Sequence, residues 1–148
     1  MTHVRTQIRA AFVFRLTGLA TTGTAVFAQR TRPNTDALPY LKVWLGDDSG
    51  ELLNATDDQI EQRTADLVIE AYAKDNSDME VILDQIAMEV QQQIATTADR
   101  SFGGLVKMLG APRIEPDVDD TLEKPCGVNR ITYPLTYFIA GSNPAASL

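Results

Sequence analysis

The sequence contains one cysteine and one histidine among 148 residues, and this scarcity excludes several kinds of chemistry. Cys126 has no partner for an internal disulfide, so the fold must be stabilised by packing alone. His3 lies next to the N-terminus, which leaves the rest of the chain without a histidine for a catalytic triad or a histidine-based metal site. The sequence therefore predicts no catalytic residue and no enzyme activity.

Motifs for phosphate and metal binding are also lacking. Gly103, Gly104 and Gly110 match neither the Walker spacing nor the dinucleotide fingerprint, and they are typical of turns. Residues 117, 119 and 120 are aspartates that could share a divalent cation, but the calcium-loop pattern is absent. We interpret this stretch as a solvated acidic loop, with a weak ion site shared between subunits as the alternative. We expect no cofactor and no metal.

Acidic residues are absent from residues 1–35, which contain five arginines, whereas the remainder has 20 acidic and 8 basic residues. Binding to polyphosphate depends on lysines and arginines that displace counterions, so the acidic body predicts no specific binding of nucleic acid. The N-terminal segment imitates a targeting signal, but Arg15 interrupts its apolar run and we assign it to the fold. No window approaches the ~20 apolar residues that a bilayer requires, so no membrane contact is expected.

Hydrophobic periodicity predicts two helices and several strands. Apolar residues recur at helical spacing over residues 6–19 and 79–94, and residues 96–100 are expected to end the second helix. Strands are expected where apolar and polar residues alternate or β-branched residues gather, namely at residues 25–28, 40–45, 63–74, 105–109 and 128–139. Pro134 lacks an N–H group and predicts a sheet edge or a bulge in the last strand.

This order of elements predicts an α+β fold with a single domain. We expect a two-layer sandwich with a mainly antiparallel or mixed sheet of four to six strands and two helices packed on one face. The domain should span residues 1–140, and residues 141–148 are predicted to form a flexible C-terminal tail. The alternating strand at residues 63–74 should have one face in the core and the other in water.

Some apolar residues fall outside the predicted core. Phe14, Val81 and Met88 lie on the far sides of the two helical stripes, and Leu52 and Leu53 lie in a long acidic stretch over residues 46–62. Single exposed hydrophobic residues are normal on a protein surface. Their presence on the outer faces of both helices nevertheless favours an assembly interface, and long loops often carry function.

Three stretches together resemble one family. They are residues 5–19 (RTQIRAAFVFRLTGL), residues 38–44 (LPYLKVW) and residues 123–137 (EKPCGVNRITYPLTY). They resemble the tail terminator proteins of siphophages, the lambda-like minor tail protein U group. The resemblance implies a structural virion protein that is made in the host cytoplasm and forms a hexameric ring at the neck-proximal end of the phage tail.

Such a ring would cap the tail tube, end its polymerisation and join the head-side connector or stopper protein, while genomic DNA passes through its lumen without specific binding. In this setting Arg5 and Arg9 of the first helix would meet an acidic surface of the neighbouring subunit. The stretch with Leu52 and Leu53 would dock onto the tail tube protein. The predicted subunit or tube interface thus comprises Arg5, Arg9, Phe14, Leu52, Leu53, Val81 and Met88.

Two other interpretations remain. The chain could be a head–tail connector or completion protein, or a tail tube subunit, and open-ended polymerisation would distinguish a tube subunit from a terminator. From another class, it could be a small acidic ligand-binding or enzymatic domain that uses its carboxylates with Tyr133 or Tyr137. That interpretation requires a concave pocket with convergent polar groups.

Overall fold

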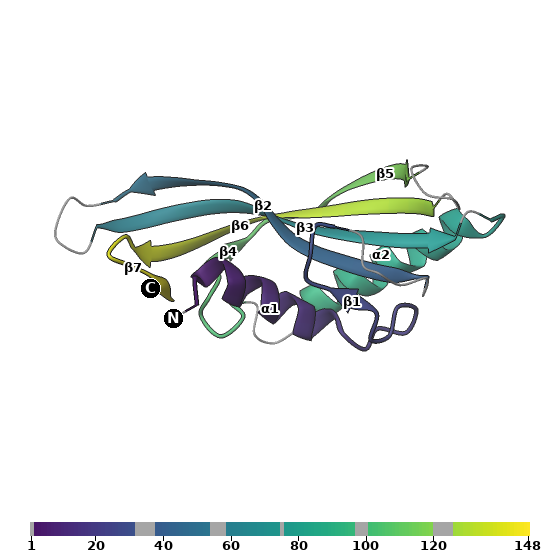
Figure 1. Cartoon of the computed structure of the whole chain (residues 1–148), viewed down its shortest axis with the longest axis horizontal. Coiled ribbons are helices and arrows are strands. Elements are labelled where there is room, and N and C mark those ends of the chain that lie inside the picture. The colour runs from purple at the N-terminus through teal and green to yellow at the C-terminus, as the bar shows by residue number, and fades with distance from the viewer. Residues whose placement is uncertain (1, 32–37, 54–58, 75, 97–100, 120–125) are drawn as a thin grey trace.

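The computed structural model describes residues 2–31, 38–53, 59–74, 76–96, 101–119 and 126–148. These residues form two helices and one sheet of seven strands, whose arrangement can be followed in Figure 1. In chain order the elements are α1 (Val4–Leu16), β1 (Val26–Phe27), β2 (Tyr40–Leu52), β3 (Ile60–Lys74), α2 (Met79–Thr96), β4 (Met108–Leu109), β5 (Arg113–Asp119), β6 (Cys126–Ala140) and β7 (Asn143–Ser147). The predicted α+β class is confirmed. The sheet has seven strands, which is one more than the upper limit of the predicted four to six.

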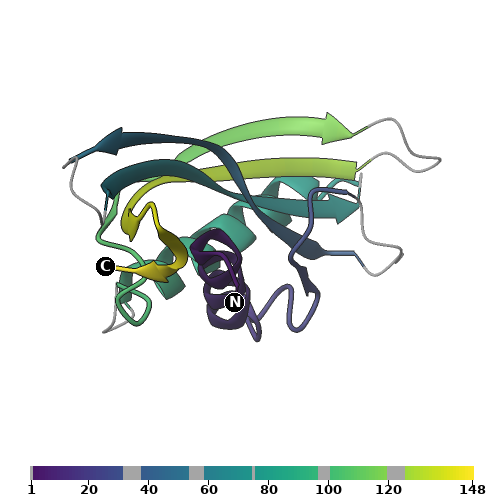
Figure 2. The same cartoon turned by 60° about the vertical axis from the view of Figure 1, so that its left-hand side comes forward.

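The long strands β2, β3 and β6 form the antiparallel centre of the sheet. β3 pairs with β6 over its whole length from Ile60 to Lys74, and on its other side it pairs with β2 from Glu61 to Tyr72. β1 adds a short parallel pairing to β2, which makes the sheet mixed. The outer side of β6 pairs in turn with β5, β4 and β7. The sheet is curled, and both helices lie on the same side of it (Figure 2).

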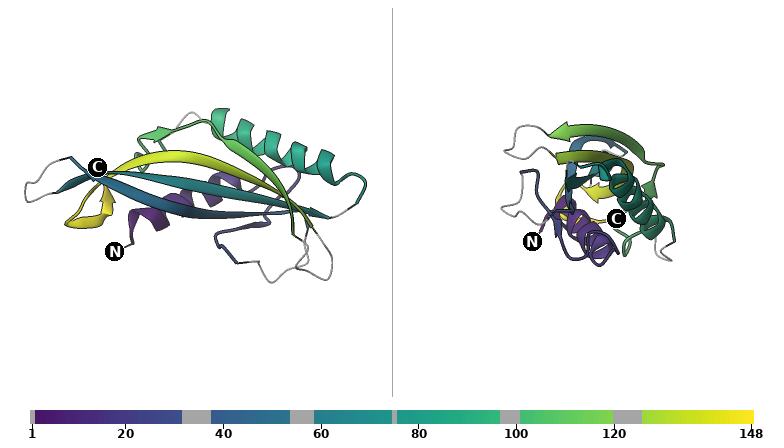
Figure 3. Two further views of the ribbon diagram at one scale, coloured as in Figure 1. Left: turned by 90° about the horizontal axis from the view of Figure 1, so that it is seen from above. Right: turned by 90° about the vertical axis from the view of Figure 1, so that its right-hand side faces the viewer.

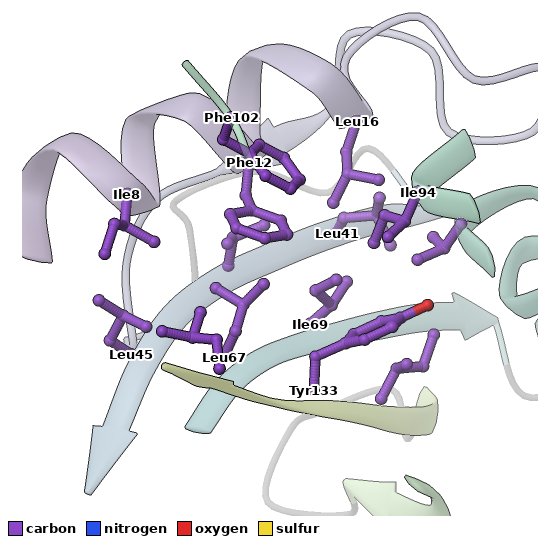
Figure 4. Packing of buried hydrophobic residues seen from close by; sticks show 14 of the residues in the cluster. Ile8, Phe12, Leu16, Leu41, Leu45, Leu67, Ile69, Ile94, Phe102 and Tyr133 are labelled. Carbon is purple, nitrogen blue, oxygen red and sulfur yellow. The ribbon is translucent and has the colours of Figure 1, made fainter. Parts of the chain in front are cut away.

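The core lies between the helices and this side of the sheet. Alternate residues of each central strand point toward the helices, as Leu41, Ile69 and Tyr133 do in Figure 4. Each helix contributes one apolar stripe, which includes Ile8, Phe12 and Leu16 of α1 and Leu83, Ile86, Val90 and Ile94 of α2. Burial of each such side chain stabilises the fold by about 1.5–3 kcal/mol. This packing holds both helices against the sheet.

Helix α1 begins and ends two to three residues before its predicted bounds. The Nδ1 atom of His3 accepts a hydrogen bond of 3.0 Å from the backbone N–H of Arg5 and caps the first turn. The helix ends at Leu16, and Gly18 follows with a φ of 97°. This left-handed conformation is accessible to glycine at little cost, so it stops the helix although Leu19 continues the apolar spacing.

Residues 46–62, predicted as a loop, belong largely to two strands. β2 continues to Leu52 and β3 begins at Ile60, with a register shift between Leu45 and Asp48. These strand ends extend beyond the helices (Figure 3), and we call residues 47–53 with 59–64 the arm. Both faces of the arm are largely exposed, which removes the alternation of apolar and polar residues that predicts a strand. The prediction of a loop was therefore wrong for residues 47–52 and 60–62.

Pro134 lies where the outer neighbour of β6 changes from β5 to β4. β5 pairs with β6 as far as Thr132, and β4 pairs from Leu135 onward. The Pro134 carbonyl accepts a 2.7 Å hydrogen bond from the N–H of Gly110, so its backbone polar groups face this outer side. The missing N–H thus falls away from β3, which explains how proline is tolerated in a strand that has neighbours on both sides.

The C-terminal residues 141–148 differ from the predicted flexible tail. Residues Asn143–Ser147 form β7, and the N–H of Leu148 donates to the Phe138 carbonyl at 2.9 Å. The Gln7 amide also donates to the Ala145 carbonyl at 2.7 Å and thereby links α1 to this strand. Small polar residues gave no local strand signal here, because pairing with β6 determines the conformation.

The face of the sheet without helices is not simply exposed to water, in contrast to the prediction. Lys42 and Glu70 are buried on it, with 5% and 6% of their surface accessible. Residues on the segment after β1 cover this part of β2, since the Lys42 ammonium donates to the Arg30 carbonyl at 2.7 Å. The Arg30 guanidinium also lies 5.4 Å from the centre of the Trp44 ring. No helix in the described ranges is both long and apolar enough to cross a bilayer.

Candidate functional site: assembly surfaces and charged clusters

Phe14 is the most exposed large apolar side chain of the described residues, with 85% of its surface accessible. It borders a groove of about 620 Å³ between the C-terminal half of α1 and α2, lined by Ala11, Phe14, Arg15, Thr17, Gln93 and Phe102. The guanidinium of Arg15 lies 3.8 Å above the Phe102 ring, which stacks on Phe12 in the core. We call these six residues with Arg9 the α1 surface. It combines an aromatic side chain with positive charge.

A second apolar surface lies between α2 and β5. Its exposed residues are Val81, Met88, Ile114 and Val118, with accessible fractions of 71%, 44%, 41% and 54%. Met88 and Ile114 line a shallow groove of about 530 Å³ that also includes Asp84. We call these four apolar residues with Asp84 the α2–β5 surface.

Strand register explains why β5 contributes to this surface. Ile114 pairs with Ile131, and Val118 pairs with Gly127, so the side chains of Ile114 and Val118 share the helix side of the sheet. A β-carbon at Gly127 would lie 2.3 Å from the Met79 sulfur, which places α2 directly against this position. The absence of a side chain at Gly127 therefore allows α2 to pack closely against β6. Because β5 pairs with β6, β5 then lies beside α2.

The outer edge of β5 is unsuited to strand pairing. β6 directs the backbone groups of its even-numbered residues toward β5, and these residues pair with Arg113, Glu115 and Asp117. The backbone of Pro116 must then face outward, where it offers no donor. Prolines and charges at an edge strand oppose the addition of a further strand. Association through β5 should therefore use its side chains.

The arm exposes a third apolar feature. Leu52 and Leu53 are 55% and 50% accessible, and Glu51 beside them is exposed. The N–H of Leu53 donates to the Ile60 carbonyl at 2.8 Å, so the pairing of the arm continues to this point. The arm presents two exposed leucines on a projection whose other exposed residues are mostly polar.

The structure thus confirms that Phe14, Val81 and Met88 are exposed, and it shows that Leu52 and Leu53 are exposed as well. These five predicted interface residues lie on three separate surfaces. Residue positions on α2 place the groove at Met88 and the groove at Gln93 on opposite flanks of the helix, because successive residues turn by about 100°. The α1 surface and the α2–β5 surface consequently face different directions. Their part in an interface stays a prediction.

The two predicted interface arginines have different environments. Arg5 donates to Asp48 at 2.7 Å and to the carbonyls of Leu45 and Gly46 at 3.2 Å each. Arg9 is half-buried on the flank of α1, and within the described residues it forms no ion pair. Arg5 therefore links α1 to the base of the arm, and Arg9 is the better candidate for contact with another molecule.

Asp48 is bound by three donors from three elements, which we call the Asp48 cluster. Arg5 of α1 and Arg63 of β3 lie 2.7 and 2.8 Å from its carboxylate oxygens, and the hydroxyl of Tyr137 in β6 donates at 2.5 Å. Burial alone would raise the pKa of Asp48, but the hydrogen bond from Tyr137 and the two guanidinium groups outweigh it and lower this pKa below 3.8. Burial and then the bond to Asp48 raise the pKa of Tyr137 to about 12.

Glu70 is the centre of a second cluster, which we call the Glu70 cluster. The Lys42 ammonium lies 3.7 Å from one carboxylate oxygen, and Arg130 lies 3.3 Å from the other. The Trp44 indole N–H donates to Glu70 at 2.8 Å. Lys42, Glu70 and Arg130 occupy paired positions on β2, β3 and β6, so register alone brings them into one row.

These clusters were missed by the sequence analysis for different reasons. The partners of Asp48 are far from it in sequence, and no local spacing predicts their meeting. Lys42 and Glu70 offered a usable signal, because each lies on the outward face of an alternating strand and their charges are opposite. The predicted exposure of that face to water gives no reason for such a pair, whereas the structure buries both side chains.

Both clusters bind their carboxylates to cations within the chain, which favours a stabilising role over a catalytic one. Tyr137 is bonded to Asp48, and Tyr133 is buried in the core. Across the residues that the structure describes, no group of three His, Cys, Asp or Glu side chains could hold a metal ion. Asp117 and Asp119 of the predicted acidic loop belong to strand β5, so the prediction of a loop was wrong for these two residues, and Asp120 lies outside the described residues.

Comparison with known proteins does not place the chain in a family. No protein-family model matches the sequence, and no curated protein matches it.

Proposed function

We propose that this protein is a structural subunit of a bacteriophage tail, a tail terminator whose copies assemble into a closed ring at the end of the tail tube nearest the head. The observation that carries the proposal is the pair of exposed apolar surfaces on different sides of one small chain. Phe14 marks one, and Met88 with Ile114 marks the other. A subunit of a ring requires two such surfaces, because each copy contacts two neighbours.

The fold suits this role as a two-layer α+β sandwich, with the helices as one layer and the sheet as the other. Exposed apolar side chains that the core leaves unused are typical of surfaces that become buried on assembly. The resemblance of residues 5–19, 38–44 and 123–137 to siphophage tail terminators supplies the position in the virion. The formal net charge of −7 agrees with a lumen that lets genomic DNA pass without binding it.

The arm is the proposed contact with the tail tube protein. Leu52 and Leu53 lie on a paired two-strand extension whose base is held by Asp48, Arg5 and Arg63. A projection with a fixed base can present apolar side chains to a second protein with little loss of conformational entropy. The opposite side of the ring would then receive the connector or stopper protein of the head.

Native mass spectrometry at low and moderate salt, with negative-stain images of the same samples, tests the assembly. Closed rings of about six subunits are the expected result. Long tubes would replace the proposal with a tail tube subunit. A monomer at every concentration would contradict the ring and favour a small ligand-binding domain.

A separate experiment tests the arm. The variant Leu52→Gln with Leu53→Gln should still form rings but should no longer co-sediment with tail tubes of the same virus. Capping by the double variant at the wild-type level would remove the arm from the tube contact. Met108→Gln is the matched control, since Met108 is 66% exposed on β4 and belongs to none of the three surfaces.

A further inference from the structure

We propose that the α1 surface of one copy binds the α2–β5 surface of a second copy, with Phe14 seated beside Met88 and Ile114. This inference rests on the proposed function and names the contact that joins neighbouring subunits. Each of the two surfaces is thereby assigned one partner, which is the other surface on a second copy of this protein.

Charge is the first argument for this pairing. α1 contains three arginines and no acid, whereas α2 contains three acids and no basic residue. β5 adds three acids and one arginine. Opposite charges steer two surfaces together and fix their orientation, and like charges disfavour contact. An α2–β5 surface would therefore repel its own copy and attract α1.

The arrangement of side chains around Phe14 is the second argument. On a helix that turns by about 100° per residue, Arg9 and Arg15 lie roughly 140° and 100° from Phe14 on its two sides. Phe14 is thus an aromatic residue between two cations. In the α2–β5 surface, Asp84 lines the groove together with Met88. An arginine beside Phe14 would meet this carboxylate when the ring enters the groove.

The chemistry of the groove suits an aromatic side chain. Methionine adapts its shape to a neighbour and makes favourable contacts with aromatic rings through its sulfur. Ile114 forms the other wall and is 41% accessible, so a contact would remove more of its surface from water. Aromatic residues that fill a partner's groove carry much of the binding energy in protein interfaces.

The arm is the rival occupant of the α1 surface, because Glu51 and two leucines could also meet Phe14 and Arg15. The α2–β5 surface is favoured because it combines four exposed apolar residues with a groove, whereas the arm is a narrow projection. The two surfaces lie on opposite flanks of α2, so their pairing joins copies head to tail. Such contacts close into a ring when the rotation between copies allows it.

Two variants test the contact, each altering one surface. Phe14→Glu changes the α1 surface, and Met88→Glu changes the α2–β5 surface. Both side chains are exposed, at 85% and 44%, so we expect circular dichroism and thermal unfolding close to those of the wild type. Sedimentation velocity and native mass spectrometry should show that each variant alone is monomeric, with self-association weakened at least about tenfold.

An equimolar mixture of the two variants is the decisive sample. Phe14→Glu retains its α2–β5 surface and Met88→Glu retains its α1 surface, so the mixture should form a one-to-one heterodimer and no larger species. Met108→Gln is the control and should assemble as the wild type does. Absence of the heterodimer would overturn the head-to-tail pairing. Loss of assembly in Leu52→Gln but not in Met88→Glu would assign the α1 surface to the arm instead.

The outcomes separate this inference from the proposed function. Wild-type rings that persist in both variants would overturn the contact and leave the terminator proposal standing. Open filaments that disappear in both variants would support the contact and overturn the terminator. A wild-type protein that stays monomeric at all concentrations would overturn both.

Discussion

Asp48 and Glu70 occupy similar surroundings in opposite parts of the sheet. Each carboxylate is bound by two cationic side chains and one neutral donor, which is the Tyr137 hydroxyl for Asp48 and the Trp44 indole for Glu70. The partners of Glu70 lie at paired positions on neighbouring strands, whereas the partners of Asp48 come from α1, β3 and β6. The Glu70 cluster therefore reinforces the sheet, and the Asp48 cluster joins a helix to the base of the arm.

The cations of the two clusters also differ in burial. In the Glu70 cluster the Lys42 side chain is 6% accessible and that of Arg130 is 38% accessible, whereas those of Arg5 and Arg63 are 29% and 26% accessible, so only Lys42 is a buried cation. Removal of a carboxylate leaves its cations without a partner, and the cost depends on how well water can then solvate them. The same change should thus destabilise the protein more at Glu70 than at Asp48.

The largest effect is expected for Glu70→Ala. Because Lys42 would remain buried without its counter-ion, the free energy of unfolding should fall by about 3–5 kcal/mol. Urea denaturation monitored by circular dichroism at pH 7 gives this value. The double variant Glu70→Leu with Lys42→Met is the control and should lose much less, since neither charge is left unpaired. An equal loss in both would mean that packing, and not the unpaired charge, determines the cost.

Asp48→Ala should have a smaller effect, about 1–3 kcal/mol, because water can reach both arginines. The loss should be accompanied by faster hydrogen exchange in the first turn of α1 and in the arm, which Asp48 links through Arg5 and Arg63. Exchange measured by mass spectrometry locates the change. Faster exchange spread evenly over the sheet would contradict the proposed link.

Elements with one buried face could be predicted from the sequence, whereas elements without such a face could not. Both helices, the central strands and the exposure of Phe14, Val81 and Met88 followed from periodicity, because a single stripe of each helix faces the core. β5 was missed because Pro116 and four charges hide the alternation of Ile114 and Val118. The arm was missed because neither of its faces is buried.

Contacts between residues far apart in the sequence limited how much of the site could be predicted. Tyr137 lies 89 residues from Asp48 and Arg5 lies 43 residues from it, so only the tertiary fold brings them together. The charges of the Glu70 cluster could have been paired from strand register, had the strands been aligned correctly. The α2–β5 surface required both the omitted strand β5 and its register on β6.

The pH dependence of stability should also distinguish the Asp48 cluster. A lowered pKa of Asp48 in the folded state means that its contribution is complete above the unfolded value of about 3.9 and is lost as pH falls through the folded value. The stability difference between wild type and Asp48→Asn should hence be constant from about pH 6 to 8 and shrink below about pH 4. Denaturation curves across this range measure it, and a difference that does not begin to shrink as pH falls below about 4 would contradict the charge-based origin.

Tyr137 should produce the opposite dependence at high pH. Its pKa is raised to about 12, so its contribution is complete below the unfolded value of 10.0 and is lost as pH rises toward 12. Absorbance at the tyrosinate band should show a late-titrating component that decreases by one tyrosine in Tyr137→Phe. A late component of unchanged size in that variant would contradict the assignment to Tyr137.

The smallest effect is expected for an ion pair outside both clusters. Arg113 and Glu115 on β5 lie 2.8 Å apart, but their side chains are 69% and 47% accessible. Water and salt screen such a pair, so Arg113→Ala should change the free energy of unfolding by less than about 0.5 kcal/mol. The same substitution makes β5 more acidic and should strengthen head-to-tail association slightly at low salt, an effect that sedimentation velocity can detect. Weaker association at low salt would instead place Arg113 in contact with an acidic group of the neighbour, which α1 does not supply.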